Sequence, residues 1–224
     1  FWCEATRTCP KLIGRSQSFL MLPGSELLNN VKGFLDDTEG QRLHLLALEA
    51  GEHGPCLEIG SYCGKSALYL GAACRENRTV LFSIDHHRGS EEQQPGQAFF
   101  DPELWSPHSG TIDTISYFRR TIQRADLEDV VLPIVCRSSV AARFWQIPLG
   151  LVFIDGSHDY ESVLADFIGW KDHLVPGGYL IFHDIYTDVA KGGLAPYKVY
   201  QLARTDSGFE ERPMTHSLGV LKKI

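Results

Sequence analysis

Short apolar runs alternate along most of the chain with longer segments in which apolar residues recur every three or four positions. The runs predict strands and the periodic segments predict helices: strands over 56–59, 80–84, 130–136, 149–154 and 178–182, and helices over 38–50, 65–74, 111–124 and 160–174. The runs LVFI at 151–154 and YLIF at 179–182 are apolar at every position, as expected for parallel strands covered on both faces. Two more strands are predicted near 207–211 and 217–222.

Strands that alternate with helices of this length are typical of an α/β protein. The expected fold is therefore Rossmann-like and doubly wound, with a mostly parallel seven-stranded sheet and helices on both faces. A chain of 224 residues is long enough for one domain with a sizeable core, so we predict a single domain over 1–224. Residues 1–35 form an N-terminal extension in this prediction, and Thr38 is the expected N-cap of the helix over 38–50.

Residues 86–110 follow a different pattern, because they are polar and rich in glycine and proline. A long segment without a helical or strand period is unusual in a compact domain unless it is functional or disordered. This one carries Phe99, Phe100 and Trp105 among its polar residues. We interpret it as a lid over a substrate, with a packing surface as the alternative.

Composition narrows the class of partner. The formal net charge is −7, and lysine and arginine never occur in runs longer than two, which argues against nucleic acid and against a membrane surface as partners. No stretch approaches the roughly 18 apolar residues of a membrane span, and no signal peptide is recognisable. None of the six cysteines forms a C-x-x-C pair, so a structural zinc site is not expected and a reduced, cytoplasmic setting is.

The first strand runs into a glycine loop, Glu58-Ile-Gly-Ser-Tyr-Cys-Gly-Lys-Ser66, that can be interpreted in three ways. From Gly60 to Ser66 it is one residue shorter than a phosphate-binding P-loop, so its N–H groups would point differently. A dinucleotide fingerprint would need glycine where Tyr62 stands. The third pattern, E-x-G-x-x-x-G, places a carboxylate beside the loop, which suits a ligand with an ammonium group. In an open α/β sheet a ligand binds at this edge in each case.

The third pattern resembles motif I of the class I S-adenosylmethionine-dependent methyltransferases, and a second stretch strengthens the resemblance. Residues 151–184 are similar to the cephalosporin hydroxylase-like and macrocin O-methyltransferase-like families, with Asp155, Gly156, His158, Tyr160, Val163 and Asp166 followed by Pro-Gly-Gly and by His183-Asp184. The Thr-Glu-Gly-Gln segment at 38–41 resembles the related catechol and caffeoyl-CoA O-methyltransferases. The resemblance covers about residues 36–185.

The resemblance implies S-adenosylmethionine as cofactor and a small molecule as methyl acceptor, with a hydroxyl oxygen as the expected acceptor atom. The cofactor would be held by residues after the first four strands: Glu58, Gly60, Ser61, Gly64, Ser66, Asp85, His86, Ser138, Ser139, Asp155 and Gly156. Asp85 suits the ribose hydroxyls and His86 the adenine end, although an acidic residue here is also common in dinucleotide enzymes. Ser138 and Ser139 could instead simply cap the short helix that follows.

Methyl transfer needs an aligned acceptor and a group that takes its proton. His158, His183 and Asp184 are the expected catalytic residues, and His158 is preferred as the base because an unperturbed imidazole titrates near pH 6.5. Each histidine could instead have a structural role, in orienting a helix or packing at a strand end. Asp155 and Asp184 could hold Mg²⁺, but histidine is a poor magnesium ligand, so the metal question stays open.

Two other functions remain alternatives at this point. The loop from Gly60 to Ser66, with Asp155 as a Mg²⁺ carboxylate, would suit a P-loop-like nucleotide hydrolase. A non-catalytic cofactor-binding scaffold could have kept the fold alone. Aromatic residues near both ends of the chain are compatible with a homodimer.

Overall fold

The computed structural model describes residues 22–188 and 194–224. Its centre is a seven-stranded sheet with the order β5-β2-β1-β6-β7-β9-β8. The strands are β1 (Cys56–Ile59), β2 (Leu81–Asp85), β5 (Val131–Val135), β6 (Leu149–Ile154), β7 (Leu174–Phe182), β8 (Phe209–Thr215) and β9 (Leu218–Lys223). The pairs along β5-β2-β1-β6-β7 are parallel, and β9 is antiparallel to both its neighbours. The expected α/β class and mostly parallel sheet are confirmed.

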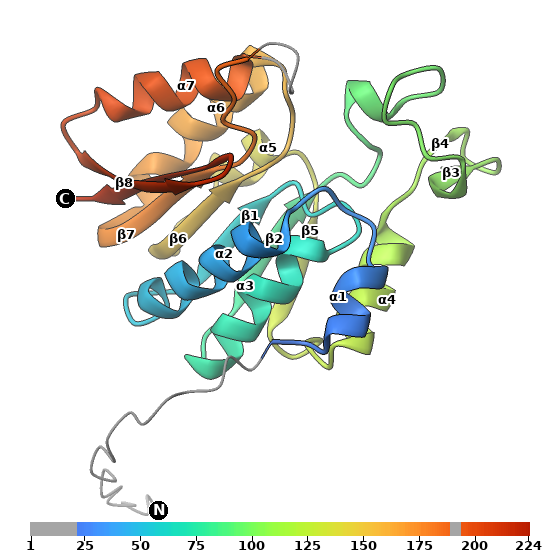
Figure 1. The fold of residues 1–224 in the computed structure, drawn as a ribbon, viewed down its shortest axis with the longest axis horizontal. Helices are drawn as coiled ribbons and strands as arrows, with labels where there is room; N and C mark the ends of the chain where they lie inside the picture. Colours follow the sequence, from blue (N-terminus) through green and yellow to red (C-terminus); the bar gives the residue numbers. More distant parts are fainter. Residues whose placement is uncertain (1–21, 189–193) are drawn as a thin grey trace, which may run out of the picture.

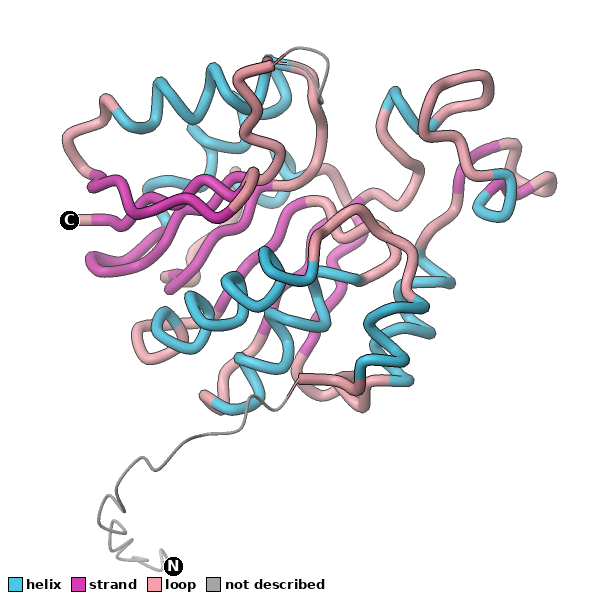
Figure 2. Tube along the Cα trace, viewed as in Figure 1, coloured by secondary structure: helices cyan, strands magenta, loops and turns pink. Residues whose placement is uncertain are grey.

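Helices cover both faces of this sheet (Figures 1 and 2). One layer contains α1 (Ser25–Asn30), α2 (Asp37–Ala50), α3 (Lys65–Glu76) and α4 (Ile115–Arg124), and the other contains α5 (Ser138–Ala142), α6 (Tyr160–Trp170) and α7 (Ala195–Arg204). Alternate residues of β6 feed the two cores, because successive strand side chains point to opposite faces. Leu151 and Phe153 pack in the first core, and Val152 and Ile154 in the second. The strand is therefore apolar throughout.

Several element boundaries differ from the predicted ones for local reasons. Helix α2 is capped by Asp36, not by Thr38, since the Asp36 side chain accepts from the backbone N–H of Thr38 and Glu39 completes a capping box. The helix predicted from residue 111 begins at Ile115, because residues 111–112 belong to a hairpin. Helix α6 ends at Trp170, and a 3₁₀ turn over Lys171–His173 leads into β7. The short helix α1 and the helix α7 were not predicted.

The lid segment, residues 86–110, is more ordered than its composition suggests. It contains 3₁₀ turns over Glu91–Gln93 and Pro102–Leu104, and its strand β3 (Trp105–Ser106) pairs with β4 (Thr111–Ile112). The hairpin projects from the body of the molecule (Figure 1). A small apolar cluster around Leu104 and Ile112 anchors it, and Lys32 forms ion pairs with Asp101 and Glu103 at 2.5 and 2.7 Å.

The predicted N-terminal extension is only partly described, since residues 1–21 lie outside the described residues. Residues 25–30 form α1, and the segment from Lys32 to Leu35 lines the main cavity, so this part belongs to the site. Within the described ranges, no helix has the length and apolar character needed to cross a membrane.

Candidate active site

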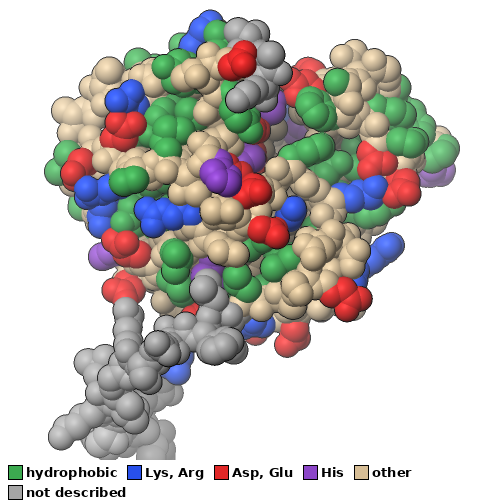
Figure 3. Space-filling model, viewed as in Figure 1, with side chains coloured by type: hydrophobic (Ala, Val, Ile, Leu, Met, Phe, Trp, Pro, Cys, Tyr) green, Lys and Arg blue, Asp and Glu red, His purple; other side chains and the backbone are tan. Residues whose placement is uncertain are grey.

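A cavity of about 690 Å³ opens at the carboxyl ends of β1, β2, β6 and β7. Strand order reverses between β1 and β6, which is where open α/β sheets bind ligands. The space-filling view shows the surface hollowed between the body and the lid, with histidine side chains inside the hollow (Figure 3). The cavity brings together all but two of the predicted site residues: Gly60, Ser61, Ser66, Asp85, His86, Ser138, Ser139, Asp155, Gly156, His158, His183 and Asp184.

The glycine loop can come close to the end of β6 because Gly60 has no side chain. Its φ is +88°, and a Cβ there would lie 2.1 Å from the carbonyl oxygen of Asp155. The next residue, Ser61, is 2% exposed, and its Oγ has no hydrogen-bond partner among the described residues. A buried hydroxyl without a partner is costly unless a ligand or water supplies one. The loop therefore presents an unsatisfied polar group to the cavity.

Glu58 and Gly64 are the two predicted cofactor residues that do not line the cavity. Gly64 has a φ of +92° and precedes α3, so it shapes the loop. Glu58 is fully buried behind the loop, where its carboxyl accepts hydrogen bonds from Ser66 Oγ at 2.7 Å and from Ser83 Oγ. Burial raises the pKa of Glu58 to about 7, against the lowering effect of the two serines. The structure thus places Glu58 as a support of the loop, not as the expected direct contact of an ammonium group.

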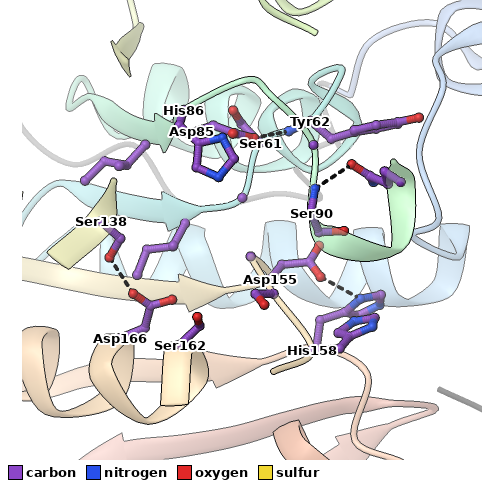
Figure 4. Close-up of a pocket in the computed structure, with 18 of the residues that line it drawn as sticks. Ser61, Tyr62, Asp85, His86, Ser90, Ser138, Asp155, His158, Ser162 and Asp166 are labelled. Carbon is purple, nitrogen blue, oxygen red and sulfur yellow. Dashed lines mark hydrogen bonds and ion pairs between the residues drawn. The ribbon is translucent and has the colours of Figure 1, made fainter. Parts of the chain in front are cut away.

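Asp85 stands at the end of β2 with both carboxylate oxygens turned toward the glycine loop and the lid. Oδ2 accepts from the backbone N–H of Tyr62 at 2.8 Å, and Oδ1 from that of His87 at 2.7 Å. Each oxygen keeps a further lone pair for a ligand hydroxyl. Figure 4 shows Ser61, Asp85 and His86 on the same wall of the cavity.

One end of the cavity is formed by Ser138 and Asp166 (Figure 4). Ser138 Oγ donates to Asp166 at 2.6 Å and accepts from Trp170 Nε1 at 2.7 Å. The N-cap of α5 is Arg137, so Ser138 does not serve as the helix cap that was the alternative. Burial raises the pKa of Asp166 to about 6, against the bond from Ser138. Asp166 stood in the sequence motif without an assigned site role, and the structure adds it to the cavity.

The opposite end contains His183, which three carboxylates surround. Its Nδ1 lies 3.0 Å from Asp155 Oδ1 and 3.3 Å from Asp184 Oδ2, and its Nε2 lies 3.0 Å from Glu39 Oε2. The other oxygen of Glu39 accepts from the N–H and Oγ of Ser217, both at 2.7 Å. Burial alone would lower the pKa of His183, but the carboxylates, Asp155 first, raise it well above its ordinary value. The ring is therefore held as a proton donor.

His158 lies beside it, between Asp184 and the lid. Its Nε2 is 2.9 Å from Asp184 Oδ2, and its Nδ1 is 3.0 Å from Glu92 Oε2. The bond to Asp184 raises the pKa of His158 to about 9, against the effect of burial. Burial would raise the pKa of Asp184, but the two histidines lower it far below its ordinary value. Asp184 also has a φ of +56°, a conformation unusual for a residue other than glycine.

The structure thus brings the predicted catalytic residues together, but the raised pKa values of His158 and His183 favour protonated rings, whereas a free base was expected. A histidine whose two ring nitrogens both donate hydrogen bonds has no lone pair with which to accept a proton. Asp155, His183 and Asp184 have ligand atoms within 4.8 Å of one another, so these three residues could hold a metal ion. His183 could ligate one only after losing a proton that the carboxylates stabilise.

Sequence reasoning missed two carboxylates of this end of the cavity, Glu39 and Glu92. Glu39 enters the sequence analysis only within the Thr-Glu-Gly-Gln segment at 38–41, and its capping-box position is a signal that its side chain is fixed. Nothing in the local sequence marks Glu92 as a partner of His158, because 66 residues separate them.

Three comparisons with known proteins bear on this site. The model of a family described as a methyltransferase domain matches residues 57–185. An uncharacterized protein of Sinorhizobium fredii, y4gI, is 25% identical over 167 residues, which are 74% of this chain; the chain spans only 16% of that relative's length. Among solved structures, the O-methyltransferase from Bacillus cereus in complex with SAH has a TM-score of 0.60 at 16% identity, covering 91% of this chain and 94% of that one. TomG from Streptomyces achromogenes, an O-methyltransferase of tomaymycin synthesis in complex with SAM, has a TM-score of 0.60 at 15% identity, covering 91% and 92%.

Proposed function

The chain belongs to the methyltransferase-domain family, and we propose that it transfers the methyl group of S-adenosylmethionine to a hydroxyl oxygen of a small molecule. The observation that carries the proposal is the polar lining of the cavity where strand order reverses. The sulfonium of this cofactor, when bound, supplies an electrophilic methyl group, so the protein needs only to align the acceptor and manage one proton.

The residues present fit the cofactor. The unpartnered hydroxyl of Ser61 faces the space where an amino-acid group would lie, and the missing side chain of Gly60 lets the loop pack against the end of β6 at that place. Asp85 has lone pairs left for the ribose hydroxyls, as an acidic residue after the second strand does in related folds. Ser138 and Asp166 at the far end suit the polar edge of an adenine ring, which offers both donors and acceptors.

The other end of the cavity would receive the acceptor. His158, His183 and Asp184 lie there with Asp155, so their polar atoms surround the place where an acceptor hydroxyl would have to stand. The ring N–H groups already donate to carboxylates, so a carboxylate oxygen of Asp155 or Asp184 would orient that hydroxyl by accepting its hydrogen bond. Oxygen as the acceptor atom is supported by the O-methyltransferases among the similar structures, one in complex with SAH and one with SAM.

Thermal unfolding with candidate ligands tests the cofactor. S-adenosylmethionine and S-adenosylhomocysteine are compared with NAD⁺ and ATP, each with Mg²⁺ or with a chelator. A ligand at a hundred times its dissociation constant stabilises by about 2.7 kcal/mol, a melting shift of roughly 5–10 °C for a chain of this size. We expect that shift with the two adenosyl ligands only. A shift with ATP and Mg²⁺ alone would refute the proposal in favour of a nucleotide hydrolase.

A matched pair of variants localises the binding. Ser61→Ala removes the unpartnered hydroxyl inside the cavity, while Ser207→Ala removes a hydroxyl far along the chain, after α7. Ser61→Ala should reduce the shift caused by S-adenosylhomocysteine, and Ser207→Ala should leave it unchanged. If both variants keep the full shift, the hydroxyl of Ser61 does not contact the cofactor.

The metal and the assembly are separate parts of the proposal. Mg²⁺ at Asp155 and Asp184 would add to the melting shift beyond that of the cofactor alone, and a chelator would remove the addition. The acceptor is proposed to be a small molecule and not a nucleic acid, on the acidic net charge. A homodimer is a prediction that sedimentation of the purified protein tests.

A further inference from the structure

The groups at the acceptor end of the cavity form one row of alternating acids and histidines, joined by hydrogen bonds and, between His183 and Asp184, by an ion pair. It runs from Glu39 through His183 and Asp184 to His158, and ends on Glu92. Its successive contacts measure 3.0, 3.3, 2.9 and 3.0 Å. Four of the five residues come from α2 or from the strand ends of the sheet. Glu92 alone comes from the lid.

The exposed fraction of the side chain rises steadily along this row of residues, from Glu39 to Glu92. The side chains of Glu39 and His183 are each 4% exposed, that of Asp184 is 18%, that of His158 is 29% and that of Glu92 is 43%. The inner members are fixed by Ser217 and by the surrounding core. Glu92 is therefore the residue of this row whose contact costs the least free energy to break, since solvent can already reach its carboxylate.

The turn that carries Glu92 is itself well braced. Ser90 and Gln93 form a capping box around the 3₁₀ turn Glu91–Gln93, and Gln94 Nε2 donates to the carbonyl oxygens of Arg88 and Ser90 at 3.1 and 2.9 Å. A braced turn aims the Glu92 side chain without help from His158. The Glu92–His158 pair is then a contact between the lid and the sheet, each of which has its conformation without the other.

We propose that Glu92 is a positioning residue of the reaction centre, which couples closure of the lid to the orientation of His158. With the lid closed, Glu92 accepts from Nδ1 of His158, so that Nε2 points at Asp184. When the lid lifts to admit or release a ligand, that contact breaks and the ring is free to turn. Glu92 acts through His158 and need not touch the acceptor. The name reaction centre rests on the proposed function, but the coupling itself does not.

Hydrogen exchange of the lid amides tests the coupling without a known acceptor. The purified chain is compared with Glu92→Ala, with His158→Asn and with the double variant, and Glu91→Ala is the matched control. Glu91 sits in the same turn and is exposed, and its side chain has no hydrogen bond or ion pair with the described residues. Loss of a partly exposed ion pair should speed lid exchange by roughly fivefold. The double variant should be no faster than either single one, because both break the same contact.

A spectroscopic signature separates positioning from mere stability. In protein labelled with ¹⁵N-histidine, the Nδ1 proton of His158 should give a slowly exchanging resonance, which disappears in Glu92→Ala. It should persist in Glu91→Ala, and Glu92→Gln should restore it, since the amide oxygen still accepts a hydrogen bond. Melting temperature and the shift with S-adenosylhomocysteine verify that each variant is folded.

Equal lid exchange and equal spectra for Glu92→Ala and Glu91→Ala would overturn the proposal, and so would multiplicative effects in the double variant. Failure of the cofactor assignment looks different. In that case S-adenosylhomocysteine causes no melting shift in the unaltered protein, while the Glu92 variants still release the lid.

Discussion

Replacing Glu58 by glutamine should stabilise the protein at alkaline pH and not at acid pH. The carboxyl is fully buried, and burial raises its pKa to about 7 in the folded chain, against an ordinary value of 4.5. Below pH 4 the carboxyl is protonated in the folded and unfolded chains alike, so it adds no pH dependence. Between these values the unfolded chain releases the proton and the folded one retains it, so stability falls as pH rises.

The size of the effect follows from the two pKa values. Each pKa unit corresponds to about 1.4 kcal/mol, so ionisation of Glu58 lowers stability by about 3 kcal/mol between pH 4 and pH 8. Glutamine has nearly the same shape and does not titrate. Its amide can still bond with the hydroxyls of Ser66 and Ser83, which donate and accept. Glu58→Gln should therefore not lose this stability as the pH rises.

The assay is thermal unfolding at several pH values from 5 to 8. The melting temperature of Glu58→Gln minus that of the unaltered protein should rise with pH. The rise should reach roughly 6–12 °C once Glu58 is fully ionised in the unaltered protein. Glu128→Gln makes the same chemical change at an exposed position and is the matched control. If Glu58→Gln loses stability mainly at high pH, Glu58 is ionised in the folded chain. Glu58 would then carry the negative charge that its predicted role beside an ammonium group requires.

Three other variants test the glycine loop, the buried carboxylate of Glu39 and the ion pairs of the lid. Gly60→Ala should abolish the melting shift with S-adenosylhomocysteine, since its Cβ would lie 2.1 Å from a carbonyl oxygen of the β6 loop; isothermal titration with full affinity would contradict this. Glu39→Gln removes one of the three carboxylates around His183 together with the anionic partner of Ser217, and should cost about 3 kcal/mol of stability, measured by urea unfolding, whereas a cost below about 1 kcal/mol would show that the pair adds little. Lys32→Met removes the ion pairs to the lid and should speed lid hydrogen exchange while lowering the melting temperature by less than about 4 °C, because exposed pairs contribute about 1 kcal/mol or less.

The fold could be predicted from the sequence because its central strands are buried on both faces. Runs such as 151–154 contain only apolar residues, as a parallel strand covered on both faces requires. Helix α7 was missed although its buried residues Pro196, Val199, Tyr200 and Ala203 recur at helical spacing, which is a signal that the sequence did contain. The lid hairpin was not predicted because each of its strands has only two residues, too few for a period.

The cavity residues were predictable wherever a strand end delivers them. Asp85 is the last residue of a parallel strand, Asp155 and His183 each follow one, and the carboxyl ends of parallel strands meet at one edge of the sheet. Glu58 shows the limit of this reasoning, because it lies inside its strand and not after it. The side chain of a residue within a buried strand points into a core, here toward Ser83 on the neighbouring strand.

The choice of a catalytic base shows why residue type alone was insufficient. Histidine was favoured for a pKa near 6.5 in water, but the surrounding carboxylates decide the pKa of His158 and His183 in the folded chain. The carboxylates that complete this surrounding, Glu39 and Glu92, come from the start of a helix and from the lid, which sequence spacing does not place. Since both rings donate from both nitrogens in these contacts, neither ring can take a proton from an acceptor until it has lost one of its own. The contact with Glu92 is the most exposed of them, and its loss leaves His158 still bonded to Asp184. A histidine that keeps both protons can be held in one orientation but cannot deprotonate an acceptor, so the proposed role of Glu92 is to hold the His158 ring while the lid is closed.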